Sequence, residues 1–253
     1  MTKTLIAGNW KMNLNTHDAS LYLHKLEKLL PESHPNTEVV VIPNMLVLQS
    51  LSLQAKRHQM RLGAQNAYWR DEGAYTGEVS ATMLRGIVDY ILVGHSERRH
   101  IFGETDVEIR NKVQAVLRNG IIPILCVGET ASERADGETK HVLHDQVVGG
   151  LANVTSDEIE GLVIAYEPVW AIGSGVFAKP ADVKEATTVI RHQISSLYGK
   201  EAAKKVRVLY GGSVDSGNAA EFLKTPGIDG LLIGGASLKG EEFAKIVEQA
   251  DHQ

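Results

Sequence analysis

The feature that most constrains the fold is a regular alternation between short apolar runs and longer amphipathic stretches. Most of the runs are nearly continuous, as in strands that are buried on both faces of a parallel sheet. In the stretches between them, apolar residues recur every three or four positions, which is typical of one face of a helix. The alternation therefore predicts strands at residues 4–7, 38–42, 61–64, 90–93, 121–127, 162–166, 206–210 and 230–233.

Helix ends are also visible in the sequence. An apolar stripe that begins at Ala19 runs to Leu29, and Pro31 then stops the helix. A second stripe covers residues 183–197, and Gly199 follows it as a C-terminal stop. Further helices are predicted at residues 45–56, 106–119, 139–151, 216–223 and 241–250, with a weaker one at 80–84.

Eight strand–helix units in 253 residues give about 32 residues per unit, close to the length of a βα repeat. Strict alternation is compatible with two α/β architectures, an open doubly wound sheet or a closed barrel. The Gly-x-Gly-x-x-Gly pattern of dinucleotide-binding sheets does not follow the first strand, and about 250 residues is typical of an eight-stranded barrel. We therefore expect residues 1–253 to form a single-domain closed (β/α)8 barrel, with eight parallel strands inside an outer ring of helices.

Composition excludes several classes of protein. The 26 Lys and Arg residues against 31 Asp and Glu residues give a formal charge of −5, which argues against a general nucleic-acid or anionic-membrane binder. Cys126 is the one cysteine, so the chain forms no internal disulfide and fits a reducing compartment. No apolar run approaches the roughly 18 residues of a membrane span, and the first apolar stretch is too short for a signal peptide. We expect a cytoplasmic protein that binds neither nucleic acid nor membranes.

In a barrel of this kind, chemistry takes place at the carboxyl ends of the strands. Asn9 and Lys11 follow the first strand. His95 follows the fourth strand and Glu167 follows the sixth. Taken singly, Lys11 is more readily a solvated lysine and His95 a hydrogen-bonded structural residue, and an ordinary exposed carboxylate explains Glu167 equally well. All three of these independent explanations would have to be true at once. A shared site at the carboxyl end of the barrel is therefore the better interpretation.

Glycine pairs follow the last two predicted strands. Gly211-Gly212 precedes Ser213 after the seventh strand, and Gly234-Gly235 follows the eighth. Barrels commonly build a phosphate site from backbone N–H groups at this place, because glycine lets the backbone come close to an anion. Each pair alone is explained equally well by a tight turn without a ligand. Two pairs on adjacent loops favour phosphate binding.

Two connections between the predicted elements are long. Residues 167–180 are apolar in their middle and bounded by prolines, which predicts a lid beside a charged site, with a static flap as the alternative. Residues 65–78 carry Tyr68, Trp69 and Tyr75. Aromatic residues on an extended loop indicate burial in a partner subunit, unless the loop folds back on its own barrel.

The remaining charged residues near the strand ends are predicted to be structural. A local ion-pair network is expected to position the loop after the histidine, formed by Glu97, Arg98, Arg99 and Glu104. The segment 128–137 is rich in acidic side chains, and we expect it to be solvated and without a specific role.

Five segments of the chain carry a resemblance to a known family. They read Gly8-Asn-Trp-Lys-Met-Asn13, Gly94-His-Ser-Glu-Arg-Arg99, Ala165-Tyr-Glu-Pro-Val-Trp-Ala-Ile-Gly173, Tyr210-Gly-Gly-Ser-Val214 and Leu232-Ile-Gly-Gly-Ala-Ser-Leu238. In this order they closely resemble the triosephosphate isomerase family, from the first strand to the last helix. The combination of Ala-Tyr-Glu-Pro-Val-Trp with Gly-His-Ser-Glu-Arg-Arg upstream of it is highly specific.

The resemblance implies an isomerase that interconverts dihydroxyacetone phosphate and D-glyceraldehyde 3-phosphate through an enediolate, in glycolysis and gluconeogenesis. By position, it makes Glu167 the general base, His95 a neutral electrophile and Lys11 an electrostatic stabiliser. Asn9 would help to position these groups. The chemistry suits these residue types, because one carboxylate can move a proton between adjacent carbons while donors stabilise the enediolate. The residues that would bind the substrate are Asn9, Lys11, Gly173, Ser213, Gly234 and Gly235.

The resemblance also implies supporting groups and a partner. Glu97 and Ser96 would support the site from beside the histidine, and Thr76 would reach from loop 65–78 toward the partner's site in a homodimer. Residues 168–178 would form the lid that closes over the phosphate. No cofactor and no metal is implied, and the expected ligand is a small phosphorylated three-carbon sugar.

The lid departs from the family pattern. The family commonly reads Gly-Thr-Gly-Lys-Thr-Ala there, whereas this chain has Gly173-Ser-Gly-Val-Phe-Ala178. Ser174 keeps a hydroxyl, but Val176 and Phe177 replace a polar hinge with an apolar one. We therefore expect lid opening, rather than the chemistry, to differ from that of relatives with the usual hinge.

Two other functions stay open at this point. One is a different phosphosugar barrel, such as an aldolase or an epimerase. An aldolase needs a Schiff-base lysine inside an apolar strand, however, and Lys11 follows its strand. The other is a phosphate-binding scaffold without turnover, which would have no need for Glu167 as a base.

Overall fold

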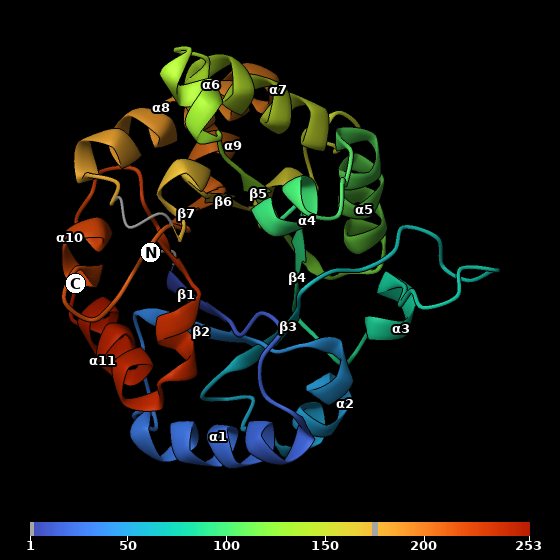
Figure 1. The fold of residues 1–253 in the computed structure, drawn as a ribbon, viewed down its shortest axis with the longest axis vertical. Coiled ribbons are helices and arrows are strands. Elements are labelled where there is room, and N and C mark those ends of the chain that lie inside the picture. The colour runs from blue at the N-terminus through green and yellow to red at the C-terminus, as the bar shows by residue number, and fades with distance from the viewer. Residues whose placement is uncertain (1–2, 174–176) are drawn as a thin grey trace.

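The computed structural model describes residues 3–173 and 177–253, and the strands in these ranges close into one barrel (Figure 1). Every strand pairs in parallel with its neighbours in sequence order, and the first closes against the last. This is the predicted (β/α)8, or TIM, barrel, and the strand bounds differ from the predicted ones by two residues at most. The strands are β1 (Thr4–Asn9), β2 (Thr37–Ile42), β3 (Arg61–Ala64), β4 (Tyr90–Val93), β5 (Ile122–Val127), β6 (Val163–Tyr166), β7 (Arg207–Tyr210) and β8 (Gly230–Ile233).

Helices form the outer ring, and local signals explain where several of them begin and end. The Asn15 side chain accepts a backbone N–H in the first turn of the first helix. Thr105 and Glu108 form a capping box. Gly199, with a φ of 88°, ends the longest helix. The helices are α1 (Thr16–Leu29), α2 (Met45–Gln54), α3 (Ala81–Leu84), α4 (Ser96–His100), α5 (Asp106–Arg118), α6 (Ala131–Ala135), α7 (Thr139–Leu151), α8 (Pro180–Tyr198), α9 (Lys200–Lys205), α10 (Ala219–Leu223) and α11 (Gly240–Asp251), with 3-10 turns η1 (Ile159–Gly161), η2 (Val169–Ala171) and η3 (Gly235–Leu238).

The short helices α4, α6 and α9 were not predicted from the sequence. Each has only five or six residues, which is too short for apolar residues to show a helical period. Helix α6 falls within segment 128–137, which we expected to be solvated and without a role. That expectation is wrong, because the side chain of Glu129 in this segment is fully buried.

The interior of the barrel is filled by alternate residues of the strands, while the residues between them pack against the helices. Cys126 belongs to this interior, and burial raises the pKa of its thiol well above the ordinary range. A filled interior fixes the strand ends relative to one another. The interior residues are Leu5, Ala7, Val40, Ile42, Tyr90, Leu92, Ile124, Cys126, Val163, Ala165, Leu209 and Leu232.

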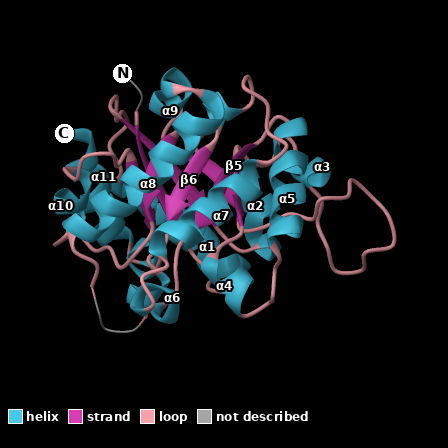
Figure 2. Ribbon diagram, turned by 90° about the horizontal axis from the view of Figure 1, so that it is seen from above, coloured by secondary structure: helices cyan, strands magenta, loops and turns pink. Residues whose placement is uncertain are grey.

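The two ends of the barrel carry different elements (Figure 2). Helices α4 and α6 lie at the carboxyl end of the strands, whereas α9 and the C-terminal end of the chain lie at the opposite end. Loop 65–78 projects away from the barrel beside α3 in both views (Figures 1 and 2). Within the described ranges, no helix is long and apolar enough to cross a membrane.

A polar network closes the amino-terminal end of the barrel. Arg207 donates to Glu38 Oε2 and to the Tyr90 hydroxyl, each at 2.7 Å. Tyr90 in turn donates to Glu38 Oε1 at 2.9 Å, and the guanidinium of Arg61 lies 3.0 Å from the same oxygen. Burial alone would raise the pKa of Glu38, but the hydrogen bonds and charges of these neighbours outweigh it and hold the pKa below its ordinary value.

Replacing this carboxylate (Glu38→Gln) is expected to destabilise the barrel in a pH-dependent way. Because the pKa of Glu38 is lowered on folding, its charge stabilises the folded state above the ordinary value of 4.5, and this contribution is lost as the pH falls. We expect the free energy of unfolding to drop by about 3 kcal/mol at neutral pH and by much less in acid. Urea unfolding of the native chain and the variant, at neutral pH and in acid, measures the loss of stability under each condition.

The matched control is Glu160→Gln. Glu160 pairs with Lys205 at the surface, where both side chains are about half exposed. Such a pair contributes roughly 0.5 kcal/mol or less, so this variant should unfold like the native chain at both pH values. An equal loss of stability at both pH values in Glu38→Gln would contradict the assignment.

Candidate active site

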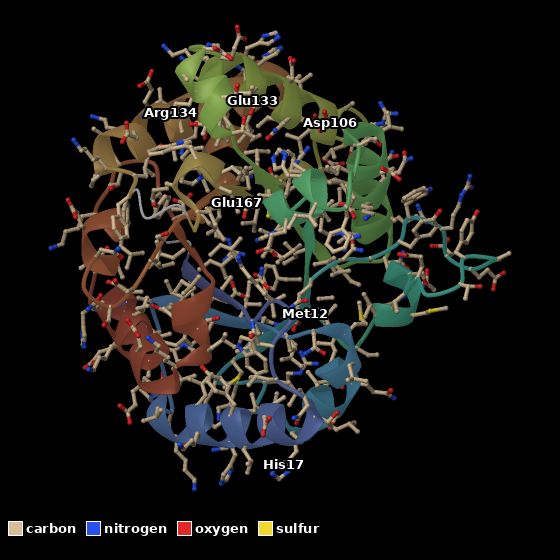
Figure 3. The ribbon with its side chains drawn as sticks, viewed as in Figure 1. Met12, His17, Asp106, Glu133, Arg134 and Glu167 are labelled. Atoms are coloured by element: carbon tan, nitrogen blue, oxygen red, sulfur yellow. The ribbon has the colours of Figure 1, made fainter. Side chains whose placement is uncertain are left out.

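A cavity of about 330 Å³ opens at the carboxyl end of the strands. The residues that the sequence singled out for catalysis and substrate binding all line it, and they lie at or after the carboxyl ends of β1, β4, β6, β7 and β8. Glu167 lies on the inner side of the ring of elements, near its middle (Figure 3). Only closure of the barrel brings such distant segments together. The lining residues predicted from the sequence are Asn9, Lys11, His95, Glu167, Gly173, Ser213, Gly234 and Gly235.

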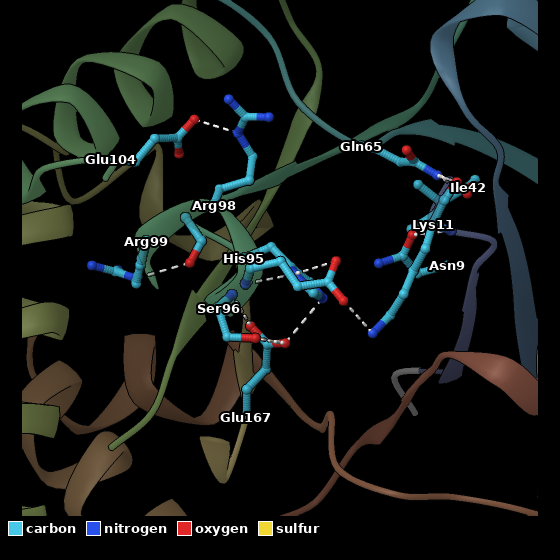
Figure 4. A network of polar contacts seen from close by, with 12 residues as sticks. Asn9, Lys11, Ile42, Gln65, His95, Ser96, Arg98, Arg99, Glu104 and Glu167 are labelled. Atoms are coloured by element: carbon cyan, nitrogen blue, oxygen red, sulfur yellow. Dashed lines mark hydrogen bonds and ion pairs between the residues drawn. The ribbon is translucent and has the colours of Figure 1, made fainter. Parts of the chain in front are cut away.

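The carboxylate of Glu167 is buried against the start of α4. Glu167 is 2% exposed, and its oxygens accept hydrogen bonds from the Ser96 backbone N–H at 2.9 Å and from the Ser96 hydroxyl at 3.0 Å. Nε2 of His95 lies 3.0 Å from Glu167 Oε1 (Figure 4). These polar neighbours compensate for the loss of water around a charged group. Ser96, predicted only as a supporting residue, thus contacts the carboxylate directly.

The imidazole of His95 occupies the N-cap of α4 and is 6% exposed. Its Nδ1 accepts the backbone N–H of Glu97 at 3.3 Å, which requires a lone pair on Nδ1. The proton of the neutral ring is therefore on Nε2, the nitrogen that faces Glu167. In this tautomer, His95 presents a neutral hydrogen-bond donor to the cavity.

Lys11 is held in an unusual backbone conformation at the edge of the cavity. Its φ of 51° lies in the left-handed region, which is uncommon for residues other than glycine. Asn9 Oδ1 accepts the Lys11 N–H at 3.0 Å, and Gln65 Nε2 donates to the Lys11 carbonyl at 2.8 Å and to the Ile42 carbonyl at 3.2 Å (Figure 4). Nζ of Lys11 lies 2.6 Å from Glu97 Oε1. These contacts hold the ammonium group beside the cavity.

Several glycines line the side of the cavity at the ends of β7 and β8. Gly234 and Gly235 lie where β8 passes into η3, and neither has a side chain that would cover its peptide groups. The Ser213 hydroxyl donates to the Ala171 carbonyl at 3.3 Å, so in this structure it contacts the predicted lid segment. Gly173 is exposed at the mouth of the same cavity. Exposed peptide N–H groups of this kind suit an anion.

The first part of the predicted lid is anchored to a buried carboxylate. Glu129 accepts hydrogen bonds from the Trp170 indole at 2.8 Å and from the Tyr166 hydroxyl at 3.1 Å. The guanidinium of Arg134 lies over the Trp170 ring at 4.1 Å and pairs with Asp182 at 2.6 Å. Trp170 is thereby fixed to α6, a connection that the sequence analysis missed.

Glu97 differs from its predicted role in the ion-pair network after His95. It pairs with Lys11 rather than with either arginine. Arg98 pairs with Glu104 as expected, whereas Arg99 pairs with Asp106 and donates to backbone carbonyls near the ends of β4 and β5. The predicted network is therefore correct for the Arg98–Glu104 pair and wrong for Glu97, whose partner is Lys11 at the edge of the cavity.

Two missed residues sit close to strand ends. Gln65 is the first residue after β3, and Glu129 is the second after β5. The rule that located His95 and Glu167, which also follow strand ends, would have pointed to these positions. Both were instead treated as members of loops.

The predicted loop residues differ in how they relate to this cavity. Thr76 is exposed on the projecting loop and does not line the cavity of its own chain. Ser174 and Val176 of the predicted hinge lie outside the described residues. Phe177 is described, is 65% exposed and lines the cavity at its mouth.

Comparison with known proteins gives one consistent result. The family model for triosephosphate isomerase matches residues 4–250. Curated relatives named triosephosphate isomerase include one from Chloroherpeton thalassium, 43% identical over 252 residues (99% of this chain and 100% of the relative). Others come from Carboxydothermus hydrogenoformans, 47% identical, and from a Thermoanaerobacter species, 46% identical, each over 249 residues (98% of this chain and 99% of the relative). The chain belongs to the triosephosphate isomerase family.

Proposed function

We propose that the chain interconverts dihydroxyacetone phosphate and D-glyceraldehyde 3-phosphate through an enediolate, without a cofactor, as a step of glycolysis and gluconeogenesis. The observation that carries the proposal is the buried Glu167 carboxylate, which faces Nε2 of His95 in a cavity that also contains Lys11. A carboxylate, a neutral donor and an ammonium group are what proton transfer beside a carbonyl requires.

In the proposed reaction, Glu167 removes a proton from the carbon next to the carbonyl and returns it to the neighbouring carbon. Negative charge develops on the oxygens as the proton leaves, and His95 Nε2–H and Lys11 Nζ stabilise it. Asn9 keeps the Lys11 backbone in place. Because Ser96 donates to both oxygens of the carboxylate, bound substrate has to draw Glu167 away from these bonds before it can act.

The phosphate group is assigned to the glycine side of the cavity. Backbone N–H groups of Gly234 and Gly235 would hold it, with Gly173 and Ser213 contributing from the lid side. Residues 168–178 would then close over the phosphate and exclude water, which otherwise promotes loss of phosphate from the enediolate. The hydrogen bond between Trp170 and Glu129 supports a fixed anchor at the start of the lid, about which the rest of the lid moves.

Two further observations bear on the proposal. Glu97 engages Lys11 Nζ, which supports an electrostatic role for Lys11 rather than the uncharged amine that a Schiff-base aldolase needs.

Cys126 is a buried free thiol, which suits a reducing compartment, so we assign the reaction to the cytoplasm.

We propose that the active form is a homodimer in which loop 65–78 contacts the partner. The loop projects from the barrel. Along it, Tyr68 stacks on Trp69 and packs at a tilt against Tyr75, with ring centroids 4.0 and 4.6 Å apart. Exposed apolar side chains near the same end of the barrel also support an interface. These include Met12 at 94%, Leu46 at 78%, Ile101 at 72% and Phe102 at 67%.

Glu167→Gln is expected to abolish most of the turnover. The amide keeps the size of the side chain but cannot accept a proton, so kcat should fall by roughly a thousandfold or more while KM changes little. Initial rates with D-glyceraldehyde 3-phosphate in a coupled assay measure both constants. Glu160→Gln, at the surface, is the matched control and should retain native rates. Equal activity in the native chain and Glu167→Gln would mean that another group moves the proton.

Glu129→Gln is expected to impair lid movement. The substitution removes the charge that faces Arg134 and weakens the acceptor for the Trp170 indole, so kcat should fall by roughly tenfold. Glu133→Gln on α6, the helix that begins two residues after Glu129, is the control, because Glu133 caps only the start of that helix. Stopped-flow measurement of product release should show the change in Glu129→Gln alone. Native release rates in that variant would remove Glu129 from the lid mechanism.

Tyr75→Arg is expected to dissociate the proposed dimer. A charge on the aromatic loop would have to be buried in the partner, so the mass in solution should fall toward the 27.6 kDa of one chain, with activity lower by about tenfold or more. Analytical ultracentrifugation tests the change in mass, and initial rates test the change in activity. Leu53→Arg, at an 85% exposed position on α2, should leave both unchanged. A native chain that sediments as a monomer would refute the dimer.

A further inference from the structure

The phenol of Tyr22 connects the outer helix ring to the segment that follows β8. Tyr22 lies on α1, and its hydroxyl donates to the backbone carbonyl of Ser237 in η3 at 2.5 Å. Its ring packs edge-on against Trp10, with centroids 4.9 Å apart and planes at 77°. Burial raises the pKa of the Tyr22 phenol well above its ordinary range, so the hydroxyl stays a donor across the working pH of the protein.

Ser237 in turn fixes the glycine turn at the cavity. Ser237 is fully buried, and both its backbone N–H and its hydroxyl donate to the Gly234 carbonyl, at 2.9 and 2.7 Å. The hydroxyl also lies 3.4 Å from the Asn9 carbonyl. In a trans peptide the N–H points opposite to the C=O. Holding the Gly234 carbonyl toward Ser237 therefore directs the Gly235 N–H the other way, and Gly235 lines the cavity.

The opposite side of Ser237 is in tight contact with the first strand. A Cβ atom on Gly8 would lie 2.9 Å from the Ser237 Cβ and 3.1 Å from the Phe243 ring, so only glycine allows this approach. Ser237 thus rests against β1 on one side, and Tyr22 holds its carbonyl from α1. Loss of the Tyr22 hydroxyl would remove the hydrogen bond that holds the Ser237 carbonyl, and the glycine turn would be less restrained on the side that faces α1.

We propose that Tyr22 is a positioning residue for phosphate recognition. By holding the Ser237 carbonyl, it keeps the Gly234–Gly235 peptide turned so that its N–H faces the phosphate of the substrate. This inference rests on the proposed function, in which the glycine turn holds that phosphate. A better-oriented phosphate donor acts on the bound substrate and on the transition state alike, so its loss should appear mainly in KM.

The test is Tyr22→Phe, which keeps the ring on Trp10 and removes only the hydroxyl. We expect KM for D-glyceraldehyde 3-phosphate to rise by about three- to tenfold with kcat within about twofold of native, as for the loss of one hydrogen bond. The Kd of inorganic phosphate, measured by calorimetry, should rise by a similar factor. With unphosphorylated D-glyceraldehyde, kcat/KM should stay at the native value, because that substrate has no phosphate to hold.

Tyr198→Phe is the matched control. Its hydroxyl donates to the carbonyls of Leu151 and Val154, at 2.9 and 3.0 Å, and so joins helix to backbone elsewhere in the fold. This variant should lower the thermal midpoint and leave KM and the phosphate Kd unchanged.

Three results would decide against Tyr22 or against the function on which the inference rests. A parallel loss of kcat/KM on both substrates in Tyr22→Phe would make Tyr22 a residue of stability only. An unchanged phosphate Kd would remove it from phosphate recognition. Native protein that binds phosphate but isomerises no triose phosphate would refute the proposed function instead. In that case, comparing the phosphate Kd of the native chain with that of Tyr22→Phe would still decide the role of Tyr22.

Discussion

Eight parallel strands satisfy their edge hydrogen bonds only when the first pairs with the last, and this closure determines where every other part of the molecule lies. The pairing of Gly8 with Ile233 brings the end of β1 beside the end of β8. The packed interior and the network around Glu38 and Arg207 then keep the strands from sliding. Side chains that follow different strands can therefore meet in one cavity with fixed distances, which loops alone would not provide.

The start of α4 serves two purposes at once. The backbone N–H of Glu97 selects the tautomer of His95, and the N–H and hydroxyl of Ser96 hold the carboxylate of Glu167. The proposed base and electrophile are thus oriented by one short helix. On the other side of the cavity, Tyr22 and Ser237 orient the glycine turn through backbone contacts. Both arrangements keep polar groups in place before substrate binds, which is the condition for electrostatic stabilisation of a transition state.

The pattern of successes and failures in the sequence analysis has a physical explanation. Strands were found because residues buried on both faces must be apolar over their whole length. Helices α4 and α6 were missed because one turn has no period to detect. Charges close in sequence predict that Glu97 pairs with the neighbouring arginines, whereas its partner Lys11 is 86 positions away along the chain. The acidic composition of segment 128–137 predicts solvation because charged side chains are usually exposed, whereas Glu129 is fully buried.

The sequence by itself determined the number and order of the strands, the closure expected from their count, and the residues at the strand ends, since these depend on local periodicity and on the geometry common to all such barrels. The family followed from the same strand-end strings. Only the tertiary structure decided which groups touch: Ser96 with Glu167, Gln65 with Lys11, Glu129 with Trp170. Such contacts depend on distances between segments that are far apart in the chain, and those distances exist only once the barrel has closed.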